Sequence, residues 1–197
     1  MVRTFFIAAA LLLGLQARAN LSSTSQVASQ AEIAVLSQTL VQAMAPQATA
    51  GIFHVGDSAD YNMNMSFITG TVHMFVRNQV AQGYWVETDV NAGMMGKQKI
   101  EVLYGNNGKV LQMIVNGQQQ TPPNPGDEKI VAMHPATITV PKGTFQCEYI
   151  KIHDNSQNTD EEVWLNRSIP VESMAKTVSQ SQLGPVTLEL TNFARGN

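Results

Sequence analysis

The sequence predicts a mainly β protein, built as a single curved antiparallel sheet or incomplete barrel of about ten strands with one N-terminal helix. Three observations lead to this prediction. Many short runs alternate apolar and polar residues, which is the period of a half-buried strand. Gly and Asn-Gly signals separate these runs at hairpin spacing. The helical pattern is confined to residues before Gly51.

The first nineteen residues have the pattern of a secretory signal peptide. Arg3 precedes an apolar run from Phe5 to Leu15, and the small-residue triplet Ala17-Arg18-Ala19 follows, so we expect cleavage before Asn20. The short, bacterial-looking regions favour export to the periplasm. The apolar run is too short to span a bilayer and no later run is longer, so we expect no transmembrane segment after signal removal.

The composition of the remaining 178 residues narrows the classes of partner. They fit one domain and carry 10 basic and 15 acidic residues, a net charge of −5. The basic residues are scattered, which argues against nucleic-acid binding, because phosphate neutralisation needs clustered Lys and Arg. Cys147 is the single cysteine, so no internal disulfide can form. Its position between Phe145 and Tyr149 favours a buried, inert thiol.

Residues 20–50 are predicted to form a helix and a linker. From Ser22 to Gln47 the chain has no Gly and one charge, and its apolar residues recur every three or four positions until Pro46. The polar face consists of Ser and Gln. A face without charge favours a helix that lies against its own sheet or against a partner.

Residues 51–197 are predicted to form the β domain. Ala59 to Phe67 alternate, Ile68-Thr69-Gly70 reads as a tight connection, and Thr71 to Gln79 alternate again. Gln118 to Gly126 contain three prolines and are predicted to be a loop, since proline lacks the donor that a central strand needs. Further strand-like runs follow at 84–90, 97–104, 109–116, 129–133, 136–140, 144–152, 161–165, 173–180 and 186–193.

No catalytic, cofactor or metal motif is present, so we expect a protein that is not an enzyme and has no cofactor. The oxygen-rich stretch from Asp154 to Glu162 fails as a calcium loop, because Thr159 and Leu165 occupy positions that require Gly and Glu. We predict a solvated hairpin loop there. The nine methionines after the signal, two of them beside histidines, suggest either a soft metal ion such as Cu(I) or adaptable apolar packing in a core or cavity.

The methionine-bearing strands lead to the candidate site. Met side chains on the apolar face of a curved sheet suit an adaptable apolar groove, although plain core packing is the simpler alternative. For the tryptophans, core anchoring competes with ligand stacking. The predicted groove wall consists of Phe53, Met63, Met65, Phe67, Met74 and Trp85.

The C-terminal third resembles a broad group of exported bacterial domains of unknown function. The matching segments are Val140-Pro141-Lys142-Gly143-Thr144-Phe145-Gln146-Cys147, Glu162-Val163-Trp164-Leu165 and Ile169-Pro170-Val171, followed by a final strand pair. The motifs cover roughly residues 130–197, and residues 50–130 match only in strand rhythm. One departure is visible, because the group often has Gly shortly after Pro-Val, whereas Glu172-Ser173-Met174 follow here.

These domains look like relatives of the lipoprotein-carrier fold, an incomplete β-barrel whose concave apolar face is covered by helices and holds acyl chains. The resemblance implies a non-enzymatic exported protein that binds a lipid or a lipid-modified partner in its groove. The alternative is a structural or adaptor domain of the cell envelope that binds another protein through its N-terminal helix.

Overall fold

Eleven strands form one antiparallel sheet in the computed structural model, which describes residues 53–65, 68–93, 96–122, 128–155, 158–181 and 184–196. The predicted signal peptide, the helix at 22–47 and Phe67 lie outside the described residues. The strands are β1 (Ser58–Met65), β2 (Ile68–Val80), β3 (Gly83–Asn91), β4 (Lys97–Gly105), β5 (Val110–Val115), β6 (Gln118–Gln120), β7 (Glu128–Val140), β8 (Gly143–Asp154), β9 (Thr159–Leu165), β10 (Met174–Ser181) and β11 (Gly184–Ala194). The mainly β, antiparallel prediction is confirmed.

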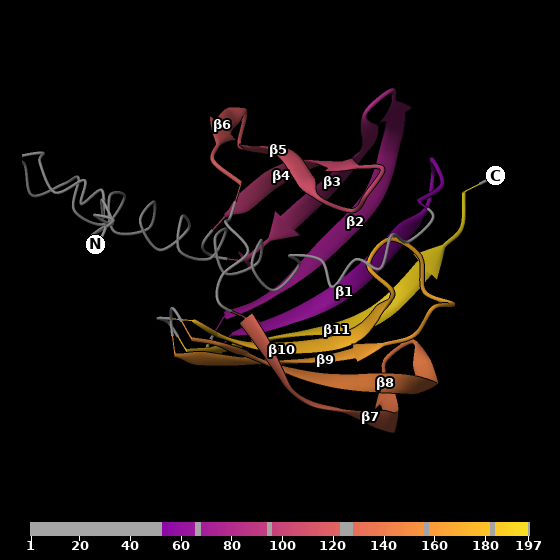
Figure 1. The fold of residues 1–197 in the computed structure, drawn as a ribbon, viewed down its shortest axis with the longest axis vertical. Coiled ribbons are helices and arrows are strands. Elements are labelled where there is room, and N and C mark those ends of the chain that lie inside the picture. The colour runs from indigo at the N-terminus through magenta and orange to yellow at the C-terminus, as the bar shows by residue number, and fades with distance from the viewer. Residues whose placement is uncertain are drawn as a thin grey trace, which may run out of the picture.

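The strand order is β6-β5-β4-β3-β2-β1-β11-β10-β9-β8-β7. Every neighbouring pair is antiparallel, and all but one are consecutive in the chain. The exception is the pairing of β1 with β11, in which Met65 lies opposite Val186 and Ser58 opposite Ala194. This pair joins an N-terminal half of the sheet to a C-terminal half (Figure 1).

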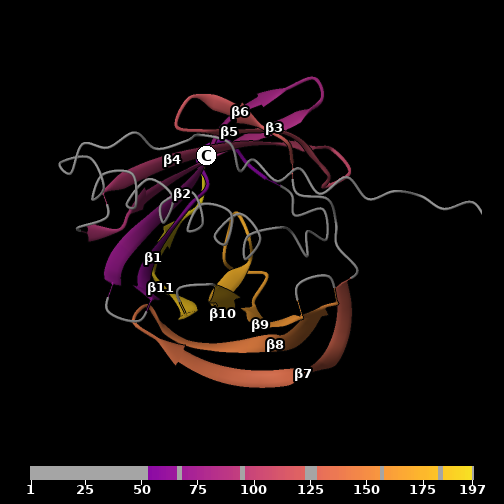
Figure 2. The ribbon, with the colours of Figure 1, turned by 90° about the vertical axis from the view of Figure 1, so that its left-hand side faces the viewer.

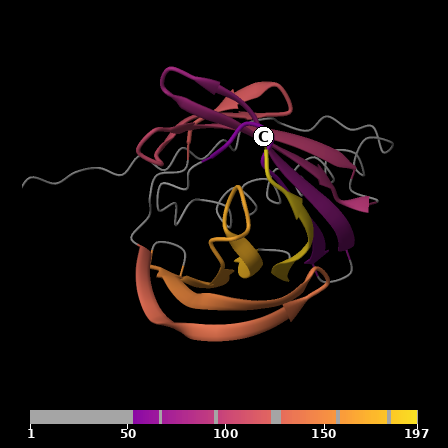
Figure 3. The same ribbon diagram turned by 90° about the vertical axis from the view of Figure 1, so that its right-hand side faces the viewer.

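The sheet bends so that its two halves face each other across an interior (Figures 2 and 3). We call the side toward this interior the inner face and the opposite side the outer face. Alternating residues of the central strands point inward and are buried because apolar side chains gather there, out of water. The buried inner-face residues of β1, β2 and β11 are Ala59, Tyr61, Met63, Met65, Val72, Met74, Val76, Val186, Leu188 and Leu190.

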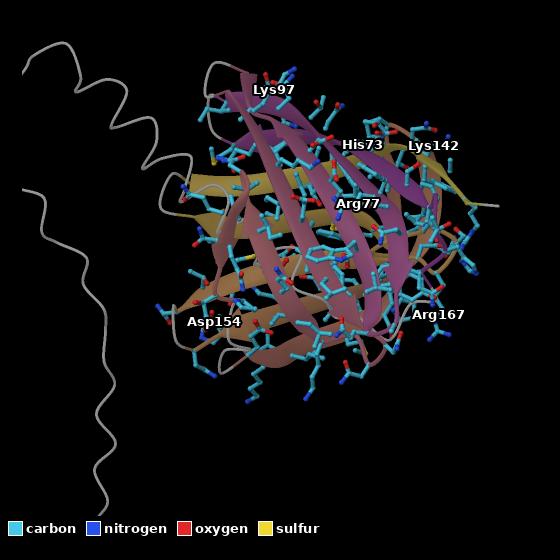
Figure 4. All side chains as sticks on the ribbon, turned by 90° about the horizontal axis from the view of Figure 1, so that it is seen from above. His73, Arg77, Lys97, Lys142, Asp154 and Arg167 are labelled. Atoms are coloured by element: carbon cyan, nitrogen blue, oxygen red, sulfur yellow. The ribbon has the colours of Figure 1, made fainter. Side chains whose placement is uncertain are left out.

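The outer face is polar and crossed by ion pairs. On β2 to β4, Arg77 pairs with Glu87 at 3.3 Å and also with Glu101, and Lys99 Nζ lies 2.6 Å from Glu87 Oε1. The Arg77 guanidinium also lies over the Trp85 ring, 5.5 Å from its centroid. Figure 4 shows Arg77 and His73 along this face.

Two connections differ from the sequence prediction. Ile68-Thr69-Gly70 is the beginning of β2, paired with Met65, Asn64 and Met63, rather than a turn. Gly70 permits this pairing, because a Cβ there would collide with the Asn91 carbonyl oxygen of β3. Thr-Gly resembles a turn signal in the sequence. These residues are part of a strand because of their register against β1, which local sequence does not encode.

The predicted loop from Gln118 to Gly126 begins with a short strand, since Gln118 to Gln120 pair with β5. At the other end of the sheet, the two predicted runs 129–133 and 136–140 form the single strand β7, which continues through Pro135. β7 pairs with β8 alone in the sheet order. An edge strand tolerates proline, because its missing N–H can face away from the ladder.

The β7–β8 hairpin turns back toward the middle of the sheet. The backbone N–H of Lys142 in its turn donates to the Leu190 carbonyl at 3.0 Å, and Lys142 Nζ donates to Asn192 Oδ1 at 2.7 Å. The same ammonium lies over the Phe193 ring. The strong bend of the C-terminal half is therefore held at this end by contacts to β11.

Candidate functional site: the inner face and its inserted segment

The structure brings four of the six predicted groove residues to the interior. Met63, Met65 and Met74 are fully buried on the inner face. Phe53 precedes β1 and is 6% exposed, with its ring 5.4 Å from that of Tyr104. These residues belong to one apolar cluster shared by both halves of the sheet.

Trp85 is not part of this wall. It sits on the outer face with Arg77 and Glu87, while its neighbours in β3, Tyr84 and Val86, point inward. The reason is the alternation of the strand, which places successive side chains on opposite faces. The prediction for Phe67 remains untested, because that residue is outside the described part of the chain.

The connection from β9 to β10 enters the interior. Asn166–Ser173, which we call the inserted segment, rises from β9 and β10 between the two halves of the sheet (Figure 3). Its apolar residues Ile169, Pro170 and Val171 are buried and extend the core cluster. The interior at this end is therefore filled by chain from the sheet's own connection.

Local hydrogen bonds shape the base of the inserted segment. Asn166 N donates to the Ser173 carbonyl at 2.6 Å, and Asn166 Oδ1 accepts from both the backbone N and the hydroxyl of Ser168. From the end of the chain, Arg195 Nη2 donates to the carbonyls of Arg167 at 3.2 Å and Ser168 at 3.1 Å. The exposed part of the segment is thus tied to the residue that follows β11.

The buried part of the inserted segment has a strained backbone. Val171 has φ of 69° and Ser173 has φ of 56°. Glu172 N donates to the Pro170 carbonyl at 3.1 Å, which makes a γ-turn with Val171 at its centre. A β-branched residue with positive φ is a genuine outlier, and a γ-turn of this sign is rare and strained. Such strain persists only where surrounding contacts hold it and is concentrated at functional sites.

Glu172 places a carboxyl group inside the core. The group is hydrogen-bonded to the Tyr104 hydroxyl on β4, and its Oε1 is enclosed without a hydrogen-bond partner among the described residues. Burial raises the pKa of Glu172 to about 8, although the hydrogen bond from Tyr104 works in the opposite direction. Nearby, Tyr61 donates to the Met174 carbonyl at 3.1 Å. The Tyr104 contact attaches the inserted segment to β4, and the Tyr61 contact attaches the first residue of β10 to β1.

A second carboxyl group, that of Glu161 on β9, is buried near the opposite end of the inner face. Thr177 Oγ1 on β10 donates to Glu161 Oε1 at 3.2 Å. Burial raises the pKa of Glu161 to about 8, with a further contribution from the charge of Glu128. Ser179, directly opposite Glu161 in the sheet, is buried and its Oγ has no hydrogen-bond partner in the described structure.

The two carboxyl groups mark opposite ends of the interior. Glu172 belongs to the inserted segment with Arg167, whereas Glu161 lies near the β8–β9 connection that begins at Asp154. Figure 4 shows Arg167 and Asp154 on opposite sides of the sheet. Between them, the inner face is mainly apolar, with Thr177 as a buried polar residue.

No sequence pattern indicates a role for Glu172 beyond the missing Gly after Pro170-Val171. The sequence predicts Glu161 both as the end of a solvated hairpin loop, because it follows several acidic and polar residues, and as the start of the strand-like run 161–165. In the structure it is in β9, and alternation turns Asp160 and Glu162 to the outer face and Glu161 inward. Extending the period of two residues through this acidic run would have placed Glu161 on the face opposite to Asp160 and Glu162.

Neither of the two adjacent methionine–histidine pairs, His73-Met74 and Met133-His134, brings its two side chains together as a metal site. His73 lies on the outer face with its Nδ1 2.6 Å from Asp60 Oδ1, while Met74 points inward. His134 stacks edge-on against Tyr149. In the described residues, no group of three or more His, Cys, Asp or Glu is arranged to hold a metal ion. Within the same residues, no helix is both long and apolar enough to cross a membrane.

A separate depression of about 410 Å³ lies beside the β1–β2 end of the sheet. It is not the predicted groove, because the exposed residues around it are asparagines, threonines and a glycine rather than apolar side chains. Its lining residues are Asn62, Met63, Asn64, Thr69, Gly70, Thr71, Asn91 and Gly93.

Cys147 is a buried free thiol in β8, as its sequence position predicts. Burial raises the pKa of this thiol, so little thiolate forms at neutral pH. We expect the native protein to react with a thiol-specific chromogenic disulfide at least about tenfold more slowly than the protein in denaturant. Equal rates in both conditions would show that the thiol is accessible.

No family model matches the chain, and no curated protein matches it. Among solved structures, a hypothetical protein, CT021 from Chlamydia trachomatis, is similar with a TM-score of 0.49 and 11% identity over 73% of this chain and 89% of that one. MucB is similar with a TM-score of 0.42 and 12% identity over 82% of this chain and 58% of that one. Likenesses at this level do not assign a function.

Proposed function

We propose that this protein is an exported, non-enzymatic binding protein that holds an apolar chain of a lipid or of a lipid-modified partner on the inner face of its sheet. The observation that carries the proposal is the inserted segment. A strained connection with a buried carboxyl group enters an interior that is lined mainly by apolar side chains of both sheet halves.

The inserted segment has the properties expected of a displaceable cover. Its strain lowers the free energy needed to move it out of the interior, and it is hydrogen-bonded to β4 through Glu172 and Tyr104. An apolar ligand would replace the contacts of Ile169 and Val171 with contacts of its own, which keeps the loss of buried apolar area small.

The methionines favour an adaptable wall. Met63, Met65 and Met74 are unbranched and flexible, so they can adjust to an acyl chain better than β-branched residues can. Export and the absence of catalytic motifs agree with a carrier or sensor of apolar chains, which needs a cover and a wall but no reacting groups.

Weakening the cover should increase ligand uptake. Tyr104→Phe removes the hydroxyl that holds Glu172, and Arg195→Ala removes the exposed tie to Arg167 and Ser168. Removing one partner of a buried hydrogen bond costs about 1–3 kcal/mol, so we expect roughly tenfold tighter apparent binding of a fluorescent fatty acid by Tyr104→Phe. Fluorescence titration of the mature protein measures this.

Tyr84→Phe is the matched control for Tyr104→Phe, because Tyr84 lies directly opposite Tyr104 in the sheet and its ring also contacts Phe53. Thermal unfolding confirms that each variant is folded. Arg195→Ala is at the surface and tests the same cover without changing the core. Uptake that is unchanged by both Tyr104→Phe and Arg195→Ala would contradict the role of the inserted segment.

Native mass spectrometry of the mature protein, purified without harsh detergent and followed by lipid extraction, tests the function itself. A bound phospholipid or fatty acid would support the proposal and identify the class of ligand. A bare polypeptide that also takes up no fluorescent acyl probe would contradict it. A protein partner that is lost on deletion of Ser22 to Gln47 would instead support the adaptor alternative, whose helix lies outside the described residues.

A further inference from the structure

We infer that the ligand of the inner face is an amphiphile with a primary ammonium head group, and that Glu161 and Ser179 bind this head group. The inference rests on the proposed function, because it assigns chemistry to one end of the same apolar surface. It depends on the position of these two residues in the sheet, on their unfilled hydrogen-bonding capacity and on the local charge.

Glu161 and Ser179 lie in a row that crosses seven strands. Each member of the row is the direct cross-strand partner of the next, so their side chains stand side by side on one face. All the other members are apolar. In order from β2 to β7, the row is Ile68, Met65, Val186, Ser179, Glu161, Ile152 and Ile130. An amphiphile lying on the inner face would meet a polar pair between apolar neighbours.

The hydrogen-bonding capacity of this pair is not used up. Ser179 is 6% exposed and its Oγ has no partner within the described structure. Glu161 accepts a hydrogen bond from Thr177 Oγ1, which leaves acceptor sites on its carboxyl group. A buried polar atom without a partner costs about 1–3 kcal/mol, so a bound donor at this position would relieve that cost.

The charges around Glu161 favour a ligand with a positively charged head group. Its chain neighbours Asp160 and Glu162 both pair with Lys151 on the outer face, at 2.8 and 4.0 Å. Among the described residues, Glu161 has no such ion pair. The charged group that faces it is another carboxylate, Glu128 of β7, whose own cross-strand partner is Asp154.

A primary ammonium group matches this site. It carries the opposite charge and three N–H donors, enough to serve the Glu161 carboxylate and Ser179 Oγ together. A carboxylate head group would instead face the acidic side chains of Glu161 and Glu128. Burial raises the pKa of Glu161, so the free site holds a proton. An adjacent ammonium cation favours the charged form, and the proton of Glu161 is then released to the solvent on binding.

Isothermal titration of the mature protein with three twelve-carbon probes below their micellar concentrations tests the inference. The probes are dodecylamine, dodecanol and dodecanoate, which share one chain length and differ in head group. We expect dodecylamine to bind at least about tenfold more tightly than either of the others, the effect of one charge-assisted contact. In Glu161→Gln this preference should fall to less than about twofold, while dodecanol binding is retained.

Glu162→Gln is the matched control, because Glu162 is adjacent in the same strand but lies on the outer face. Ser179→Ala tests the second group and should reduce the amine preference partially. Equal binding of all three probes to the wild type would overturn the head-group inference and leave apolar binding intact. Failure of every probe to bind would contradict the proposed function, and an unchanged preference in Glu161→Gln would exclude Glu161 as the head-group partner.

Discussion

Raising the pH from about 4.5 to about 8 is expected to lower the free energy of unfolding, because Glu172 and Glu161 keep their protons in the folded protein. Burial raises the pKa of each carboxyl group to about 8, whereas in the unfolded chain each titrates near 4.5. Between these values the folded state binds more protons than the unfolded state, so stability decreases as the pH increases. Below pH 4.5 and above pH 8, these two groups should contribute no slope.

Glu172→Gln should remove the part of this decrease in the free energy of unfolding that is due to Glu172. Glutamine keeps an oxygen that can accept the Tyr104 hydrogen bond but does not titrate. We expect the variant to match the wild type near pH 4.5 and to be more stable at pH 8, by of order 4 kcal/mol, since the pKa rises from 4.5 to about 8 and a difference of 1 in pKa corresponds to about 1.4 kcal/mol. Urea unfolding at several pH values measures the difference.

The comparison needs an exposed carboxylate as a control. Glu148→Gln changes an exposed residue of β8 and should leave the pH profile as it is in the wild type. If the profile of Glu172→Gln instead ran parallel to that of the wild type from pH 4.5 to 8, the carboxyl group of Glu172 would be ionised in the folded protein. The inserted segment would then be held by a charge rather than by a neutral acid.

Met65→Asp is expected to prevent stable folding, whereas Asn64→Asp should have little effect. Met65 is fully buried on the inner face, and its neighbour in β1 is exposed on the outer face. An aspartate at position 65 would bury an unpaired carboxylate and lose a large apolar side chain, which together cost more than about 4 kcal/mol. Chemical unfolding and the near-ultraviolet circular dichroism of both variants give the comparison.

Because Met65 is buried, the choice of substitution matters when ligand binding to the inner face is tested. A charge at this position would abolish ligand uptake by unfolding the protein, so its loss of binding would not locate the site. Met65→Leu nearly conserves the volume and removes the flexible thioether, with an expected cost below about 1.5 kcal/mol. If Met65→Asp were as stable as Asn64→Asp, the inner face would not be a packed core at this point.

The sequence predicted the side-chain pattern of the sheet well and the position of single residues in it less well. The alternation in β1 and β2 correctly assigned Met63, Met65 and Met74 to one buried face. Trp85 was placed on the same face because its residue type suits a groove, yet its position in β3 turns it outward to Arg77. Residue type predicts the face of a side chain less well than strand register does, because successive residues of a strand must point to opposite faces.

Composition alone could not show that the carboxyl groups of Glu161 and Glu172 are buried. Glu161 stands in an acidic run whose members look equally solvated, and only its register against Ser179 and Ile152 makes it an inner-face residue. Glu172 follows Pro170-Val171 in what reads as an ordinary connection. Its carboxyl group is buried because the connection turns inward to Tyr104, a residue 68 positions earlier in the chain.

The sequence by itself determined the class of the protein, the antiparallel strands and the faces on which their side chains lie, because these follow from a local period of two residues. The tertiary structure alone decided that β11 returns to pair with β1, that the sheet bends, and that the inserted segment lies inside the bend. Those features depend on contacts between residues far apart in the chain, and no local period encodes them. The candidate site belongs to this second group, because it forms only where the two halves of the sheet meet around Glu172 and along the row of Glu161.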